Sequence, residues 1–139
     1  MTPGTHKTME TFIALLRGIN VGGKNVLPMA ELRKTLESFG LKNIRTYIQS
    51  GNVVFESPAD RANELQTTIG NAINKCHGIT PQVLVLPLME LQKAITANPF
   101  PEAEDEPKTL HLFFLQSTPA NPDIQKLESL RTNGEQFEI

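Results

Sequence analysis

The chain has 139 residues, 39% of them hydrophobic and 20% charged, so it can build a core and is not disordered by composition. A net charge of −2 gives no overall attraction to nucleic acid or to acidic membranes. A single cysteine allows no internal disulfide, and no apolar signal or spanning segment is present. These features predict a cytoplasmic protein that does not enter a membrane.

The first half of the chain reads as alternating strands and helices. Residues 1–10 are polar, and we expect them to form a flexible tail. An apolar run at 12–17 predicts a buried strand. Pro28 begins a helix with apolar residues at helical spacing, which Gly40 ends. Two strands then follow, joined by a tight Ser-Gly-Asn turn at 50–52.

A second helix and a fourth strand complete this half. Ser57 is expected to cap the helix and Pro58 to lie in its first turn. Gly78 ends the helix, and residues 82–86 read as a strand. The buried stripe of the helix is expected to be Ala62, Leu65, Ile69, Ile73 and Cys76. The order βαββαβ predicts an α+β fold, a ferredoxin-like plait over residues 11–87.

The remainder, residues 88–139, reads as the start of a second unit. A short helix over 88–95 precedes an acidic, proline-rich loop at 98–108. We expect strands at 110–115 and 136–139, with a helix between them that begins near Asn121. This pattern predicts a partial second ferredoxin-like half.

The loop from Gly18 to Asn25 has the pattern G-x-x-x-x-G-K-N, one residue short of a nucleotide-binding P-loop. Asn25 replaces the Ser or Thr that would bind magnesium, and Pro28 delays the helix that should begin at once. A plait is also the wrong sheet for that class of enzyme. Two interpretations stay open, a wide connection that needs glycine or an anion site built from backbone N–H groups.

The stretch 12–55 closely resembles an uncharacterised, mainly bacterial family, domain of unknown function 1697. The resemblance rests on LRGINVGG at 16–23, on Pro28-Met29 with Leu32, and on YIQSGNV at 47–53. It implies two ferredoxin-like halves in tandem, and it implies no established activity.

One departure from the family pattern concerns the C-terminal end. Family members usually continue further and carry a Thr-x-Arg-Asn-Trp segment, whereas this chain has no tryptophan. We therefore expect a truncated chain or a lost second half-repeat, and any site that needs that segment to be missing here.

Our leading interpretation is a small domain that binds an anionic small molecule or partner at the glycine-rich loop. The alternatives are an enzyme acting on a phosphorylated or nucleotide substrate, and a structural domain that forms a homodimer through a sheet edge. No general base or other catalytic residue stands out, and no cofactor is implied. The candidate ligand-binding residues are Arg17, Gly18, Asn20, Gly22, Gly23 and Lys24.

Other chemistry is not supported by the pattern. The histidines His6, His77 and His111 have no metal-ligand spacing, and Cys76 is expected to be a core residue. RNA binding by a plait needs aromatic residues on the open sheet face, and this sheet offers few. The side chains that share a face of the second strand could line a cleft or face water: Arg45, Tyr47 and Gln49.

Overall fold

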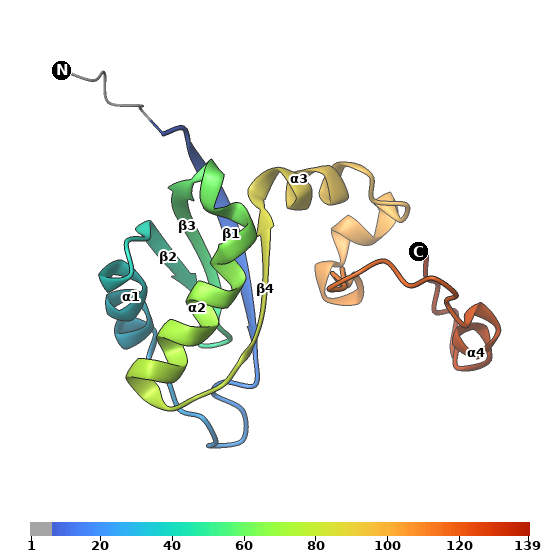
Figure 1. Cartoon of the computed structure of the whole chain (residues 1–139). Helices are drawn as coiled ribbons and strands as arrows, with labels where there is room; N and C mark the ends of the chain where they lie inside the picture. The colour runs from blue at the N-terminus through green and yellow to red at the C-terminus, as the bar shows by residue number, and fades with distance from the viewer. Residues whose placement is uncertain (1–6) are drawn as a thin grey trace. The chain divides into compact units, whose positions relative to one another are not determined.

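A computed structural model describes residues 7–139, which divide after Ile95 into two compact units. The first unit contains four strands and three α-helices (Figure 1). A 3₁₀ turn, Ala59–Arg61, leads into the second helix. The elements are β1 (Met9–Arg17), α1 (Met29–Ser38), β2 (Lys42–Tyr47), β3 (Asn52–Pro58), α2 (Ala62–His77), β4 (Gln82–Pro87) and α3 (Leu88–Thr96).

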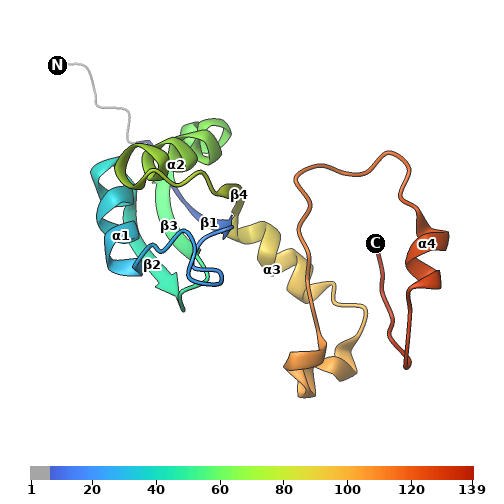
Figure 2. The same cartoon turned by 90° about the horizontal axis from the view of Figure 1, so that it is seen from below.

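The strands form one antiparallel sheet in the order β2-β3-β1-β4, which confirms the α+β class. Helices α1 and α2 lie side by side against the same face of this sheet (Figure 2). The core lies between the two helices and the sheet. On β1 the alternate residues Phe12, Ala14 and Leu16 point into it, opposite Val53 and Phe55 of β3.

Both helices contribute apolar stripes to this core. The buried side chains are Leu32 and Leu36 from α1, and Leu65, Ile69 and Ile73 from α2. Each such side chain stabilises the fold by about 1.5–3 kcal/mol relative to an exposed position. Gly40 and Gly78 follow the two helices with positive φ, as the sequence predicts.

Three details of the first unit correct the sequence predictions. Ser57 does not cap α2, because β3 continues through Pro58 and buries the Ser57 hydroxyl without a hydrogen-bond partner. Cys76 is exposed, since α2 buries Ala72 and Ile73 instead. Met9 and Glu10, expected in the tail, pair with Pro58 and Ser57 as part of β1. Residues 1–6 of that tail lie outside the described residues.

The free edge of β4 is closed by neighbouring groups. The N–H of Val85 points away from β1 and donates to Oε1 of Gln66 on α2, at 3.2 Å. By alternation the next residue facing this edge is Pro87, which has no N–H to donate. One backbone donor, that of Val83, is left along the strand, so this edge offers little to an added strand.

The second unit, residues 96–139, differs from the prediction. It contains 3₁₀ turns at Pro101–Asp105 and Pro107–Thr109 and one helix, α4 (Ile124–Ser129). The expected strands at 110–115 and 136–139 are wrong, since both segments are extended coil without strand partners. No residue of this unit is buried. Sequence reasoning inferred strands from apolar content, but a strand also needs a partner for its backbone.

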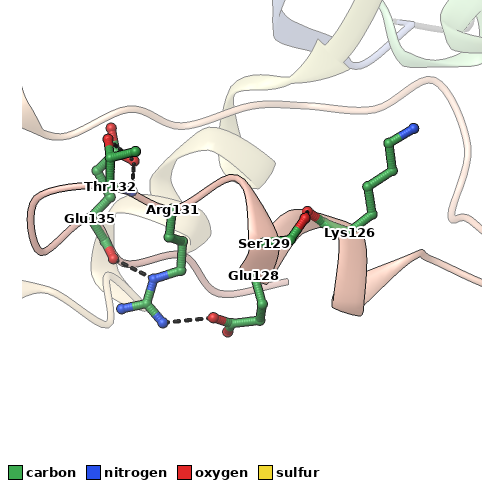
Figure 3. Close-up of polar contacts among 6 residues, drawn as sticks. All are labelled: Lys126, Glu128, Ser129, Arg131, Thr132 and Glu135. Atoms are coloured by element: carbon green, nitrogen blue, oxygen red, sulfur yellow. Dashed lines mark hydrogen bonds and ion pairs between the residues drawn. The ribbon is translucent and has the colours of Figure 1, made fainter.

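Polar contacts around the end of α4 hold the second unit locally (Figure 3). The Asp123 carboxylate accepts from the N–H of Lys126 and caps the helix. Arg131 donates to Glu128 at 2.8 Å and to the carbonyl oxygen of Glu135 at 2.6 Å. Such exposed pairs contribute at most about 1 kcal/mol each, so they fix local shape rather than a core.

We expect Leu65→Ala to lower the free energy of unfolding by about 2–5 kcal/mol, because it leaves a cavity under α2. Urea denaturation measures this loss. Met89→Ala, at an exposed position of α3, is the control and should change stability by less than about 0.5 kcal/mol. Equal losses in the two variants would contradict the described packing of α2.

Candidate functional site

The loop between β1 and α1 is a narrow hairpin rather than an open cradle. Val21 and Lys24 pair across a two-residue turn made by Gly22 and Gly23, with φ of 58° and 74°. Positive φ at both central residues is the geometry that favours glycine in tight hairpins. The N–H of Asn20 then donates to the carbonyl oxygen of Asn25 at 3.0 Å, which extends the ladder.

Two buried side chains anchor this hairpin at its base. Ile19 and Leu27 are 3% and 1% exposed and belong to the core of the first unit. Between them the chain runs out to the turn and back. Apolar Val21 and Val26 are left exposed on the hairpin.

The side-chain amide of Asn20 joins three segments. Its Oδ1 accepts from the N–H of Leu27 at 2.7 Å, and its Nδ2 donates to the carbonyl oxygens of Leu27 and Gln49, each at 2.9 Å. Both amide hydrogens are therefore used within the fold. Asn20 shapes the loop and has no donor left for a ligand.

The turn between β2 and β3 packs directly against this loop. The carbonyl oxygen of Gly51 accepts from the N–H of Leu16, and Gly51 has φ of 80°. A Cβ at this position would lie 2.6 Å from Cδ1 of Ile19 and 2.8 Å from Cβ of Leu16. The two segments LRGINVGG and YIQSGNV, separate in sequence, thus meet at one end of the sheet.

The loop does not reproduce a P-loop. The N–H groups of Asn20 and Lys24 are used in internal hydrogen bonds, whereas a P-loop leaves such groups free for phosphate. Asn25, at the position of the magnesium-binding Ser or Thr, donates its Nδ2 to the carbonyl oxygen of Gly18 at 2.8 Å. An anion at this loop would therefore be held mainly by side chains.

The sheet face opposite α1 and α2 carries the charged side chains next to the loop. By strand alternation Arg17 shares this face with Ile13 and Leu15, since Phe12, Ala14 and Leu16 face the core. The register places Arg45, Val54, Ile13 and Leu86 in one row across the sheet, and Tyr47, Asn52, Leu15 and Leu84 in the next.

The strand register shows which way Arg45 and Tyr47 point, a question that the sequence left open. Arg45 and Tyr47 are exposed on the open sheet face, beside an apolar centre. Gln49 contributes its carbonyl oxygen to Asn20, while its side chain is exposed in the turn. Sequence reasoning missed Gln49 as a structural partner of Asn20, because nothing in either segment signals a contact over that separation.

The predicted site residues lie in this hairpin and directly before it. Arg17 and Lys24 stand before and after the turn, and both are exposed. In residues 7–139 neither of them forms an ion pair. The described residues contain no group of three or more His, Cys, Asp and Glu side chains that could hold a metal ion.

His77 lies on the other side of the sheet. Its Nε2 is 2.7 Å from Oγ1 of Thr35, so it links α2 to α1. His111 belongs to the second unit, where its ring stacks on Phe113. Neither histidine lies in the elements that form the loop. No helix among the described residues is long and apolar enough to cross a membrane.

The structure is that of a small α+β protein with a four-stranded sheet. At one end of the sheet, the loop after β1 and the turn between β2 and β3 are joined by a hydrogen bond. The model of a family of proteins of unknown function, DUF1697, matches residues 9–139, and the chain belongs to this family. The resemblance seen in the sequence is thereby confirmed.

Among solved structures, the chain is similar to conserved bacterial protein SP0830 from Streptococcus pneumoniae, with 34% sequence identity and a TM-score of 0.59. The match covers 66% of this chain and 51% of that chain, so it spans about half the length of that protein. None of the curated proteins matches the chain.

We expect Gly51→Ala to cost about 2–5 kcal/mol of stability, because it adds unfavourable positive φ to overpacking against Ile19. Gly23→Ala is the matched control, since φ is also positive there but the added methyl group meets open space. It should cost about 1–2 kcal/mol. Thermal and urea unfolding of both variants measure the difference, and equal losses would show that the two turns are not packed together.

We expect Asn20→Ala to cost about 2–4 kcal/mol, because three hydrogen bonds are lost and buried Leu27 keeps an unpaired N–H. The control Asn25→Ala also replaces an asparagine of positive φ but removes one exposed side-chain hydrogen bond, a loss of at most about 1.5 kcal/mol. Urea denaturation compares the two. A larger loss for Asn25→Ala would contradict the central position of Asn20.

Proposed function

We propose that this chain is a binding domain whose glycine-rich loop holds an anionic group, carried by a small molecule or by a partner. Arg17 and Lys24 supply the positive charge, and Asn20 holds the hairpin that presents them. Gly18, Gly22 and Gly23 allow the backbone turns that bring the two cations to the same end of the sheet.

One observation carries this proposal, the absence of acidic residues from the two segments that meet here. Residues 11–30 and 43–55 contain no Asp or Glu, yet they contain Arg17, Lys24 and Arg45. Elsewhere in the first unit, Lys34 and Arg61 pair with acids one helical turn away. A surface with unpaired cations and no acids attracts anions, and neutralising them there is favourable.

An enzyme acting on a phosphorylated or nucleotide substrate remains the alternative. No observation favours it, because the two segments at this end of the sheet contain neither histidine nor cysteine. A charge-stabilising arginine and lysine are present, but a positioned base is not. A structural role through sheet-edge pairing is less well supported at the edge of β4, since Gln66 and Pro87 close it. β2 forms the other edge of the sheet.

We further propose that the first unit is a ferredoxin-like plait. The order βαββαβ, the antiparallel strand order β2-β3-β1-β4 and the two helices on one face all support this assignment. We propose a cytoplasmic location on the basis of cysteine usage, with one exposed thiol that no disulfide protects.

Phosphate and mononucleotides, titrated calorimetrically into the protein at low salt, test the anion site. Arg17→Ala should weaken binding by about 1.5–3 kcal/mol, the scale of a charge-assisted hydrogen bond, with little change in melting temperature. Lys34→Ala removes the same unit of charge from the helical face and should leave affinity unchanged. No measurable affinity in the parent protein, or an Arg17 effect on stability alone, would refute the proposal.

A further inference from the structure

The single tyrosine of the chain lies on the same sheet face as Arg17. On β2, the hydroxyl of Thr46 accepts a hydrogen bond from Arg33 of α1, so Thr46 faces the helices. Its neighbour Tyr47 therefore faces the opposite side, where it is 71% exposed. On β1, Leu16 faces the core, so Arg17 also faces the side away from the helices.

The register fixes how far apart these two side chains begin. Tyr47 pairs with Asn52, which pairs with Leu15, so Tyr47 and Leu15 lie two strands apart in one row. Arg17 follows Leu15 by two residues on the same strand. From strand and residue spacing, the Cα atoms of Tyr47 and Arg17 are about 12 Å apart. Two long side chains at this separation can hold the two ends of one small molecule.

The surface between them is a short apolar floor. Leu15 and Leu84, which share the row of Tyr47, are half-buried. In the next row away from the loop, Ile13 and Leu86 are buried, at 6% and 9% exposed. The accessible apolar part is therefore confined to the end of the sheet beside the loop. A protein interface uses about 20–30 residues on each side, so this part has the size of a small-molecule site.

The polar groups at this end favour a ligand with an anionic end. Arg17 forms no ion pair within residues 7–139. Gln82, opposite Arg17 on β4, is exposed, and its side-chain amide has both a donor and an acceptor. Among β1–β4, the acid on this face is Glu56, two rows from Tyr47, and its carboxylate already accepts from Nδ2 of Asn43. An anion beside Arg17 therefore meets no carboxylate from the neighbouring strands.

We propose that the ligand of this site is a nucleoside phosphate. The inference rests on the proposed function, because it names the class of ligand that the same site takes. Arg17 holds the phosphate, the base stacks against the ring of Tyr47, and the ribose between them covers Leu15. An aromatic ring beside an apolar floor fits a planar base, whereas inorganic phosphate or a sugar phosphate would use Arg17 alone.

Calorimetric titration at low salt with adenosine monophosphate, ribose 5-phosphate and inorganic phosphate tests the class of ligand. Adenosine monophosphate should bind at least about fivefold more tightly than ribose 5-phosphate, because a base stacked on an aromatic ring adds to the affinity of the phosphate. Equal affinities for these two, both weakened by Arg17→Ala, would refute the nucleoside phosphate and leave the proposed function standing. No affinity for any of the three would refute both.

Substitutions of Tyr47 separate stacking from the burial of apolar surface. Tyr47→Phe keeps the ring and should bind adenosine monophosphate within about twofold of the parent. Tyr47→Leu keeps an apolar side chain without a ring, so it should lose the preference for adenosine monophosphate and keep the parent affinity for ribose 5-phosphate. Phe113→Leu, at an exposed position of the second unit, is the matched control and should behave as the parent. A folded Tyr47→Leu variant that keeps the preference would overturn the proposal.

Tyr47 also gives a direct signal, since the chain has one tyrosine and no tryptophan. In proton NMR spectra its ring signals should move upfield when adenosine monophosphate is added, because of the ring current of the stacked base, and should stay in place with ribose 5-phosphate. Unchanged signals at saturating adenosine monophosphate would overturn the contact. Single-stranded oligoadenylate that binds at least about tenfold more tightly than the mononucleotide would overturn the proposal in favour of nucleic acid, which adds further phosphates and stacked bases.

Discussion

One side-chain amide holds together the end of the sheet on which the proposed site depends. The side chain of Asn20 forms the kind of hydrogen bonds that a strand backbone would form. It accepts from the backbone N–H of Leu27 and donates to two carbonyl oxygens. Without it, the loop after β1 and the turn after β2 would have no polar contact beyond the bond from Leu16 to Gly51. The path of the chain between Arg17 and Lys24 follows from this arrangement.

The features that sequence predicted well were set by local chemistry. Gly40 and Gly78 mark the helix ends because they follow directly on helical stripes. A turn between two strands was also predicted correctly, but it covers residues 48–51 rather than 50–52, since Asn52 already pairs with Tyr47. Ser57 was predicted as a helix cap because the capping pattern is also local. In the structure Ser57 pairs with Glu10 of β1, so β3 continues through this position. For Cys76, a small error in helix phase was enough to exchange core for surface.

The candidate site was only partly accessible to sequence reasoning. The glycines and the two cations could be identified as a loop, because they lie close together along the chain. That Asn20 binds Gln49, and that Gly51 must be small because of Ile19, are contacts between distant segments and leave no local signature. The prediction of a strand at 110–115 was wrong for a related reason, since strand propensity says nothing about whether a partner strand is present.

The bond between Gln66 and Val85 gives the molecule a built-in reporter. The Val85 amide lies on a sheet edge, where hydrogen exchange would ordinarily be fast, yet a side chain from α2 protects it. Its exchange rate therefore records how often α2 separates from the sheet, independently of whether β1 and β4 stay paired. Neighbouring amides that bond to β1 record the opening of the strands themselves. Comparing the two would separate loss of the helical layer from global unfolding in one experiment.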